Sequence, residues 1–364
     1  MFASTGICFS RRRRATEIHV MNRRDTFKFL LAPTLLSWRF ARAEEIEPFD
    51  FKKVRSGYLD RIASIKKSGA LPILDIESSY NPTQIDLPAF VRSMDRAGIA
   101  QMCISVDQPV GLVNEGKTWS HHSFECARKY PAHFIPAGNG GNHPAWTLSP
   151  DRFLDDNERY IAANSYPLMG EFEFRHYPSP RQIARGDLFR DVSIPINGPQ
   201  GHRLFSFAEK TGIPFQIHYE IEDTLLEPLE SMLVRYPKAK VIWCHFTQIR
   251  YQARSSRYSP QFLKTWFEKY PNLYIDTAFA DSRSIYQPSG ERHGRYWNQV
   301  KDWQSVIVEN PYRFLAALDI GGDRMNRIEE WTLGRREFLN TLPADVQEIV
   351  AYKASWKLLF NEEL

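Results

Sequence analysis

Short apolar segments alternate with longer amphipathic segments along most of the chain. The short segments are rich in branched and aromatic side chains and end at polar residues, which is typical of buried strands. The longer ones repeat their apolar residues about every 3.6 positions, as in an amphipathic helix. The expected strands cover residues 73–76, 101–106, 133–137, 168–174, 214–218, 240–245, 272–276 and 313–318. The expected helices cover residues 87–97, 120–129, 150–163, 202–210, 224–235, 260–269, 303–310, 324–339 and 344–359.

This strict alternation of strands and helices predicts an α/β fold, specifically a single-domain (β/α)8 TIM barrel over residues 44–364. A doubly wound sheet that binds a dinucleotide would need a G-x-G-x-x-G turn after its first strand. The glycine clusters at 138–141 and 321–322 do not fit that motif. In a barrel, the chemistry lies at the carboxyl ends of the strands and in the loops that follow them. The long connections 175–199 and 277–302 are therefore expected to cover a substrate.

The charge of the chain is concentrated at its beginning. The formal net charge of +4 comes from 47 basic and 43 acidic residues. Residues 1–43 hold nine of the basic and two of the acidic ones, so residues 44–364 carry 38 against 41 and a net charge of −3. A nucleic-acid partner is therefore not expected. The four cysteines lack the spacing of a disulfide framework or a structural zinc site.

The first 43 residues have the order of an export signal. Arg23 and Arg24 precede the apolar run 29–38, and a small-x-small site follows at 41–43. We interpret residues 1–43 as a twin-arginine signal, with Met21 as an alternative start, and expect a periplasmic protein. The competing interpretation is an amphipathic helix on a membrane surface. The run is too short to span a bilayer, so no stable membrane insertion of the mature chain is expected.

Ionisable residues stand at the ends of five expected strands. Asp75 and Glu77 close the first strand, and Glu171, Glu173 and Arg175 alternate along the fourth. The fifth ends at His218, the sixth at His245 and the eighth at Asp319. Each alone has an ordinary structural explanation, since Glu171 or Glu173 could pair with Arg175 and Asp319 could cap a turn. Because the strand ends meet at one mouth of the barrel, together they favour a site for a divalent metal.

These residues carry a resemblance to a known family. The chain resembles the amidohydrolase superfamily over about residues 70–360, in particular the amidohydrolase-related branch that includes aminocarboxymuconate-type and aromatic decarboxylases. The resemblance rests on Pro-Ile-Leu-Asp-Ile-Glu-Ser-Ser at 72–79, Gln-Ile-His at 216–218, Val-Ile-Trp-Cys-His at 241–245, Asn-Leu-Tyr-Ile-Asp at 272–276 and Arg-Phe-Leu-Ala-Ala-Leu-Asp at 313–319. The family opens with Asp-x-His-x-His, whereas this chain has Glu77 and Ser79 at the histidine positions. Some decarboxylases of the branch also carry Glu at the first of them.

The resemblance implies one divalent ion, Zn or Mn, bound by Glu77, His218 and Asp319. His245 would be a fourth ligand or an acid/base beside the ion, and Asp319 would be the catalytic base. Glu173 and Asp75 would orient the ligands.

Arg175 would clamp an anionic group of the substrate, unless it pairs with Glu171 inside the protein. Trp243 would wall a substrate pocket, unless it packs in the core.

Three functions remain open at this point. The expected function is metal-dependent hydrolysis of a small carbonyl substrate, anionic or aromatic, by activated water. The alternative is non-oxidative decarboxylation of a small aromatic or unsaturated acid, favoured by Glu77. A further alternative is an exported barrel that binds a small ligand without catalysis. The expected partner is a small-molecule substrate, and a second copy of the chain, in a homodimer, is a further candidate partner.

Overall fold

The computed structural model describes residues 47–80, 85–106, 121–141, 143–246, 248–280, 285–286, 291–292 and 295–364. The predicted signal segment 1–43 lies outside the described residues, so export stays a prediction from sequence. None of the described helices has both the length and the apolar character needed to cross a membrane.

All eight predicted strands are present, and they form two parallel sheets. One sheet has the order β1-β2-β3 and the other the order β11-β8-β7-β6-β4-β5, in which only β5 is antiparallel to its neighbour. The eight barrel strands are β1 Ile73–Tyr80, β2 Ile99–Val106, β3 Phe134–Pro136, β4 Met169–His176, β6 Phe215–Tyr219, β7 Val241–Trp243, β8 Leu273–Asp276 and β11 Phe314–Leu315. Shorter strands are β5 Val192–Ser193, β9 Ile285–Tyr286 and β10 Glu291–Arg292.

Two isolated bridges join the sheets into a barrel. Ser78 in β1 pairs with Ile320 beyond β11, and Gly138 beyond β3 pairs with Met169 in β4. The strands are almost wholly buried on both faces, as parallel strands covered by helices must be. The predicted (β/α)8 fold is confirmed, and the carboxyl ends of its strands point to one mouth.

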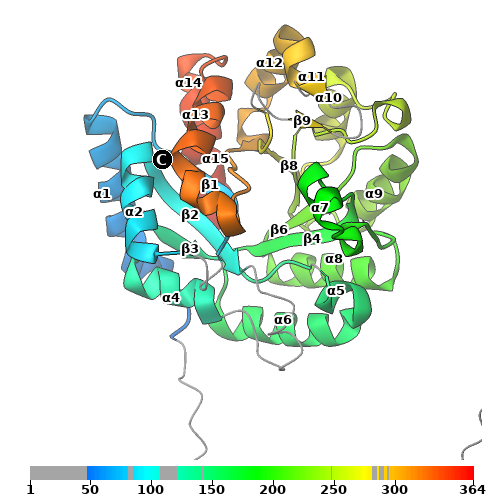
Figure 1. Ribbon diagram of the computed structural model, residues 1–364, viewed down its shortest axis with the longest axis horizontal. Helices are drawn as coiled ribbons and strands as arrows, with labels where there is room; N and C mark the ends of the chain where they lie inside the picture. Colours follow the sequence, from blue (N-terminus) through cyan, green and yellow to red (C-terminus); the bar gives the residue numbers. More distant parts are fainter. Residues whose placement is uncertain are drawn as a thin grey trace, which may run out of the picture. The chain divides into compact units, whose positions relative to one another are not determined.

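Helices surround the strands, as Figure 1 shows. The α-helices are α1 Phe51–Lys67, α2 Leu87–Ala97, α4 His121–Lys129, α5 Ala145–Leu148, α6 Pro150–Asn164, α7 Pro180–Arg185, α8 Pro199–Thr211, α9 Asp223–Arg235, α10 Pro260–Lys269, α11 Arg295–Asn298, α12 Val300–Glu309, α13 Ile328–Leu339, α14 Ala344–Glu348 and α15 Ala354–Phe360. The 3-10 turns are η1 Leu188–Arg190, η2 Gln252–Arg254, η3 Pro311–Arg313 and η4 Gly322–Arg327, and a π-turn, η5 Ile349–Lys353, precedes α15. Asp86 caps the beginning of α2, because its side chain accepts a hydrogen bond from Ala89 N.

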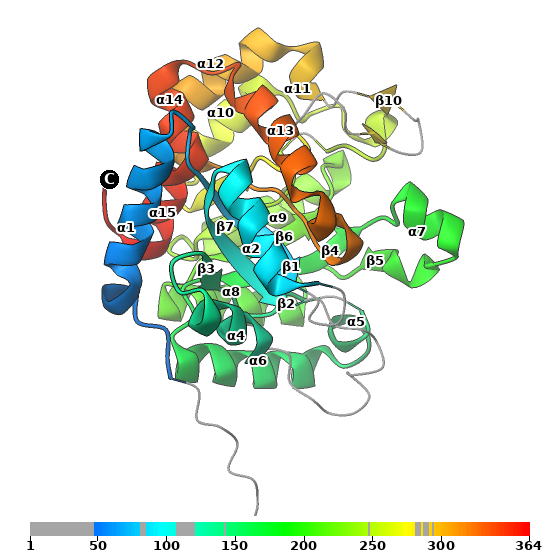
Figure 2. The same cartoon turned by 60° about the vertical axis from the view of Figure 1, so that its left-hand side comes forward.

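Several segments differ from the predicted elements. Helix α1 was not predicted, because Tyr58 and Ile62 are its only buried residues. The Tyr58 hydroxyl donates to the Phe134 carbonyl at 2.7 Å, which fixes α1 against β3. Of the two connections predicted to cover a substrate, 175–199 contains α7, η1 and β5, which lie at one edge of the body, away from α1 (Figure 2). The other connection, 277–302, lies partly outside the described residues.

The last expected strand is also shorter than predicted. Strand β11 ends at Leu315, so Asp319 lies four residues beyond it, with a positive φ of 45°. Similarly, β7 ends at Trp243, and His245 lies outside the ladder with a φ of 71°. Both side chains therefore leave the regular alternation from which their directions were predicted.

Candidate metal centre

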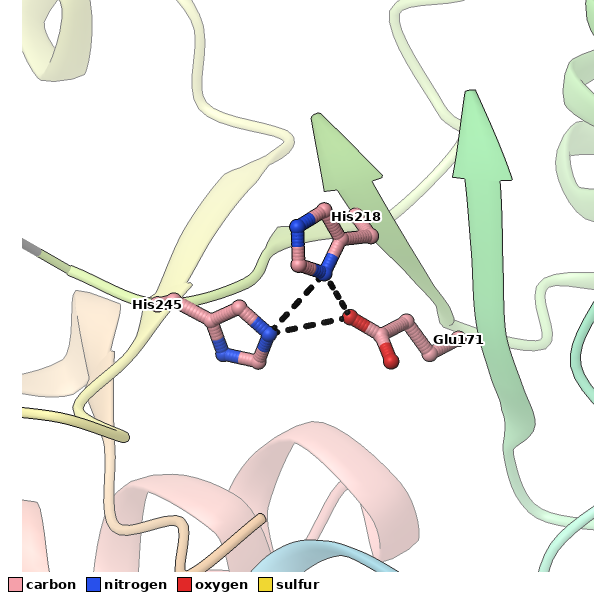
Figure 3. Close-up of side chains that lie close together, drawn as sticks. All are labelled: Glu171, His218 and His245. Atoms are coloured by element: carbon pink, nitrogen blue, oxygen red, sulfur yellow. Dashed lines mark hydrogen bonds and ion pairs between the residues drawn. The ribbon is translucent and has the colours of Figure 1, made fainter. Parts of the chain in front are cut away.

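Three polar side chains from neighbouring strands, or from the turn that follows one of them, meet in the barrel. Glu171 comes from β4, His218 from β6 and His245 from the turn after β7. The Glu171 Oε1 atom lies 2.7 Å from His218 Nδ1 and 3.1 Å from His245 Nε2, and the two imidazole nitrogens are 3.1 Å apart (Figure 3). We call these three residues the metal centre. Both imidazoles are 4% exposed, so neither is hydrated as a surface histidine would be.

The spacing of these atoms fits a small divalent cation. Ligand atoms around a tetrahedral zinc ion at about 2.0–2.1 Å lie about 3.3–3.4 Å from one another. The three atoms of the metal centre are slightly closer together than that. An ion could therefore enter with movements of a few tenths of an ångström, and one carboxylate with two imidazoles is a donor set that suits zinc.

The other ring nitrogen of His245 faces two carboxylates. His245 Nδ1 lies 3.7 Å from Glu77 Oε2 and 3.7 Å from Asp276 Oδ1. Asp276 also accepts hydrogen bonds from the backbone nitrogens of His245 and Ala278, at 3.0 and 2.9 Å, which holds the unusual backbone of His245 in place. A carboxylate behind an imidazole orients the ring, so that its opposite nitrogen can bind a metal.

Three buried atoms around His245 have no hydrogen-bond partner: Glu77 Oε2, His245 Nδ1 and Asp276 Oδ2. Buried polar groups are ordinarily satisfied, because an unmet hydrogen bond costs about 1–3 kcal/mol. The residues that carry these atoms belong to two groups with metal-ligand spacing, Glu77 with His245 and Asp276, and Glu77 with Glu171 and Cys244. The residues present therefore fit a bound cation.

The charges of the site depend on burial and on mutual repulsion. Burial raises the pKa of Glu77 well above its usual value, and the carboxylates of Glu171, Asp276 and Asp319 raise it further. Burial also disfavours the Glu171 carboxylate, but His218 and His245 outweigh it and hold its pKa well below the usual range. A cation would take the place of the protons that such groups otherwise hold.

Cys244 has the surroundings of a buried thiol. Burial raises its pKa well above the usual value, and the carboxylates nearby, Asp276 first, raise it further. Of the three cysteines in the described part of the chain, all are unpaired and buried. Cys244 is therefore a thiol at neutral pH in this structure.

Asp75 is fully buried and acts as a brace rather than a ligand. Its carboxylate accepts hydrogen bonds from Leu318 N at 2.8 Å, Glu77 N at 3.1 Å and Ser78 Oγ at 2.5 Å. It thereby ties β1 to the segment after β11. Burial raises its pKa to about 7 in spite of these hydrogen bonds.

Asp319 does not join the metal centre. Its two oxygens lie 3.2 and 3.3 Å from the guanidinium of Arg324, and its backbone nitrogen donates to the Glu77 carbonyl at 3.0 Å. Of the predicted ligands, the structure brings His218 and His245 together and places Glu77 behind His245. Asp319 is absent from the groups of described residues with metal-ligand spacing. The left-handed backbone at Asp319 turns its side chain toward Arg324 instead.

The remaining predicted site residues have partners of their own. Glu173 is buried and forms an ion pair with Arg190, and burial raises its pKa to about 7. Arg175 does not pair with Glu171. It donates to Asp191 at 2.6 Å and lies over the Tyr177 ring at 3.5 Å, on the β4–β5 excursion.

Trp243 packs in the core. Its ring lies against Tyr258 and Trp266, and its nitrogen donates to the Tyr219 carbonyl at 2.5 Å. Trp243 was predicted either to wall a substrate pocket or to pack in the core, and in the structure it packs in the core.

Sequence reasoning counted Glu171 among the residues that favour a metal site but gave it no role as a ligand, and it missed Asp276. Asp276 closes β8 directly, by the same strand-end rule that singled out His218. That rule, applied to every strand, would have identified Asp276.

Comparisons with known proteins agree with the fold. A family model described as amidohydrolase matches residues 144–314, and no curated protein matches the chain by sequence. A solved TIM-barrel protein of unknown function from Bordetella bronchiseptica is similar with a TM-score of 0.52 and 15% identity, over 79% of this chain and 98% of that one.

Two further solved structures are similar at lower scores. One is a 2,6-dihydroxybenzoate decarboxylase from Rhizobium, with a TM-score of 0.46 and 12% identity over 79% and 98% of the two chains. The other is a probable 2-pyrone-4,6-dicarboxylic acid hydrolase from Acinetobacter baumannii, with a TM-score of 0.47 and 12% identity over 80% and 99%.

Proposed function

We propose that the chain is a metal-dependent hydrolase of a small carbonyl substrate, and the match of the amidohydrolase family model to residues 144–314 supports this proposal. The proposed ion is a single Zn or Mn, held by Glu171, His218 and His245. All three residues lie inside the matched segment 144–314. This ligand set replaces the one expected from the resemblance, in which Glu77 and Asp319 joined His218.

One observation carries the proposal. Three potential ligand atoms from three strands lie within 2.7–3.1 Å of one another, beside three buried atoms without hydrogen-bond partners. In a barrel without a bound ion, such an arrangement would be costly, because burying charged groups together is unfavourable unless each is paired. The free energy of metal binding would offset that cost.

A divalent ion at this centre would lower the pKa of water toward about 7 and polarise a carbonyl group. The residues of the chain supply the rest. Asp276 holds the backbone of His245, and the carboxylates of Asp276 and Glu77 lie 3.7 Å from Nδ1, while Nε2 faces the centre. Asp319, held beside Glu77 by its backbone and paired with Arg324, is the proposed acceptor of the proton that the attacking water loses.

Decarboxylation of a small acid is the second candidate, and Glu77 favours it. The family resemblance places histidine there, and Glu is the replacement seen in some decarboxylases. In that reaction Asp319 would handle the proton at carbon while the centre holds the substrate's carboxylate. A barrel that only binds a ligand is the third candidate, and it requires no bound metal.

Elemental analysis and product analysis test this proposal. We expect about one Zn or Mn per chain, and turnover of lactones or amides without release of carbon dioxide. Carbon dioxide release from ortho-hydroxybenzoates would instead establish the decarboxylase, and a chain purified without stoichiometric metal would contradict both.

Asp319→Asn should lower kcat by about 10²–10⁴-fold with its metal retained, as expected for loss of a general base. Asp191→Asn, which removes a carboxylate on the exposed β4–β5 excursion, should keep full activity.

A further inference from the structure

Part of the connection between β4 and α8 contributes no side chain to the core. Among residues 178–191, which contain α7 and η1, no side chain that the structure describes is buried. Three large apolar side chains are instead exposed here, Ile183 at 52%, Leu188 at 67% and Phe189 at 45%. A segment with so few buried apolar contacts has a low local stability. We call residues 178–191 the flap.

One residue of the flap, Arg190, fastens it to the barrel beside the metal centre. The Arg190 guanidinium forms an ion pair with the carboxylate of Glu173, which is 3% exposed on β4, two residues after Glu171. The Arg190 carbonyl accepts a hydrogen bond from His176 Nδ1 at 2.7 Å. The His176 ring in turn lies against the ring of His218, with 4.4 Å between their centroids. A single imidazole therefore joins Arg190 to a proposed ligand of the metal.

Other contacts between the flap and the barrel are more exposed. Asp191 pairs with Arg175, but the Asp191 side chain is 55% exposed, so water screens this pair. The Phe189 ring lies 4.9 Å from the ring of His143 and still keeps 45% of its surface exposed. The attachment of the flap therefore depends mainly on Arg190.

We propose that the flap detaches from the barrel as a unit, and that the Arg190–Glu173 pair is the latch that holds it closed. Closed, as in this structure, the flap covers the side of the metal centre at His176 and His218. Detached, it opens that side to water and to the substrate. This inference deepens the proposed function, on which the role of the opening rests. Detachment exposes little apolar surface and breaks one buried ion pair, so it costs far less than unfolding the barrel.

Hydrogen exchange of the full chain, measured by mass spectrometry with and without zinc, tests the detachment. A six-residue helix is not stable by itself, so α7 should unfold and exchange its amides whenever the flap detaches. In the parent these amides should exchange faster than those of β6, which open only when the barrel unfolds. Arg190→Gln should speed exchange in the flap about tenfold, the loss expected for a charged hydrogen-bonded pair, and leave β6 unchanged.

Two further variants define the cause. Arg190→Lys keeps the charge without the planar fork and should speed exchange by a smaller factor, and it serves in place of Arg190→Gln if that variant fails to fold. Arg185→Gln is the matched control, because Arg185 belongs to the same flap, is 55% exposed and pairs with Asp187 inside the flap. It should exchange as the parent does.

Release of zinc tests whether the flap covers the metal centre. The zinc-loaded chains are mixed with an excess of the chelator EDTA, and the rate of zinc transfer is followed. Arg190→Gln should release its zinc several-fold faster than the parent, and Arg185→Gln should release it at the rate of the parent. All three chains should start with equal zinc and equal circular dichroism.

Several results would overturn the proposal. It is wrong if the amides of α7 exchange as slowly as those of β6, if Arg190→Gln leaves their exchange unchanged, or if it speeds exchange without speeding the release of zinc. The failure of the proposed function has a different signature. A chain that takes up no zinc would contradict the metal-dependent enzyme, and exchange in the zinc-free chains would still decide whether Arg190 latches the flap.

Discussion

The β1–β11 seam and the metal centre differ in how far the hydrogen bonds of their carboxylates are satisfied. In the seam, formed by Asp75, Ser78 and the segment 318–320, Asp75 accepts three hydrogen bonds. Only two residues from Asp75, Glu77 turns to the metal centre and leaves a buried oxygen without a partner. Both are carboxylates on β1, so sequence position alone does not separate them. A saturated carboxylate holds strands together, whereas an unsaturated one beside imidazoles can accept a cation.

The largest expected effect is a loss of bound metal, which a substitution in the metal centre should cause and one in the seam should not. His218→Ala removes one of three ligand atoms and should lower bound zinc at least tenfold, since loss of a ligand is a larger change than the loss of a supporting residue. Inductively coupled plasma mass spectrometry of the purified chains measures it. Asp75→Ala should retain the metal of the parent. Equal metal in His218→Ala and the parent would remove His218 from the centre.

The second effect concerns stability and belongs to the seam. Asp75→Ala leaves Leu318 N and Glu77 N without acceptors and should lower the free energy of unfolding by about 3 kcal/mol, at about 1–3 kcal/mol for each unmet bond. Urea denaturation of the zinc-free chains measures this. Asp60→Ala, at an exposed position of α1, should change stability by under about 0.5 kcal/mol. A loss that small for Asp75→Ala would mean that the seam does not depend on its carboxylate.

The smallest expected effect is an increase in the free energy of unfolding, opposite in sign to the loss expected for Asp75→Ala. Glu77→Gln removes a buried, repelled carboxyl group and provides an amide that can donate to Asp276 Oδ2. In the zinc-free chain it should raise the free energy of unfolding by about 1 kcal/mol near neutral pH.

The pH dependence follows from the raised pKa of Glu77. Because its folded pKa lies above the unfolded value of about 4.3, folding takes up a proton, and the contribution of Glu77 to stability is present below that value and lost as pH rises. Unfolding midpoints between pH 4 and 8 should therefore fall less steeply for Glu77→Gln than for the parent. Parallel curves would show that Glu77 is ionised in both states.

The sequence determined the barrel and the place of its chemistry. Strict alternation of buried strands and amphipathic helices leaves few other folds, and parallel strands direct their carboxyl ends to one mouth. His218 and His245 were predicted from that rule, and they meet there. A position at a strand end is a local property of the chain, which is why sequence reasoning reached it.

Only the tertiary structure decided which acidic groups accompany these histidines. The roles of Asp75 and Asp319 depend on Leu318 N and on Arg324, which are set by the closure of β1 against β11 and by a left-handed backbone at Asp319. The role of Arg175 depends likewise on Asp191. A carboxylate or guanidinium takes its role from the partners that saturate it, and strands distant in sequence supply those partners.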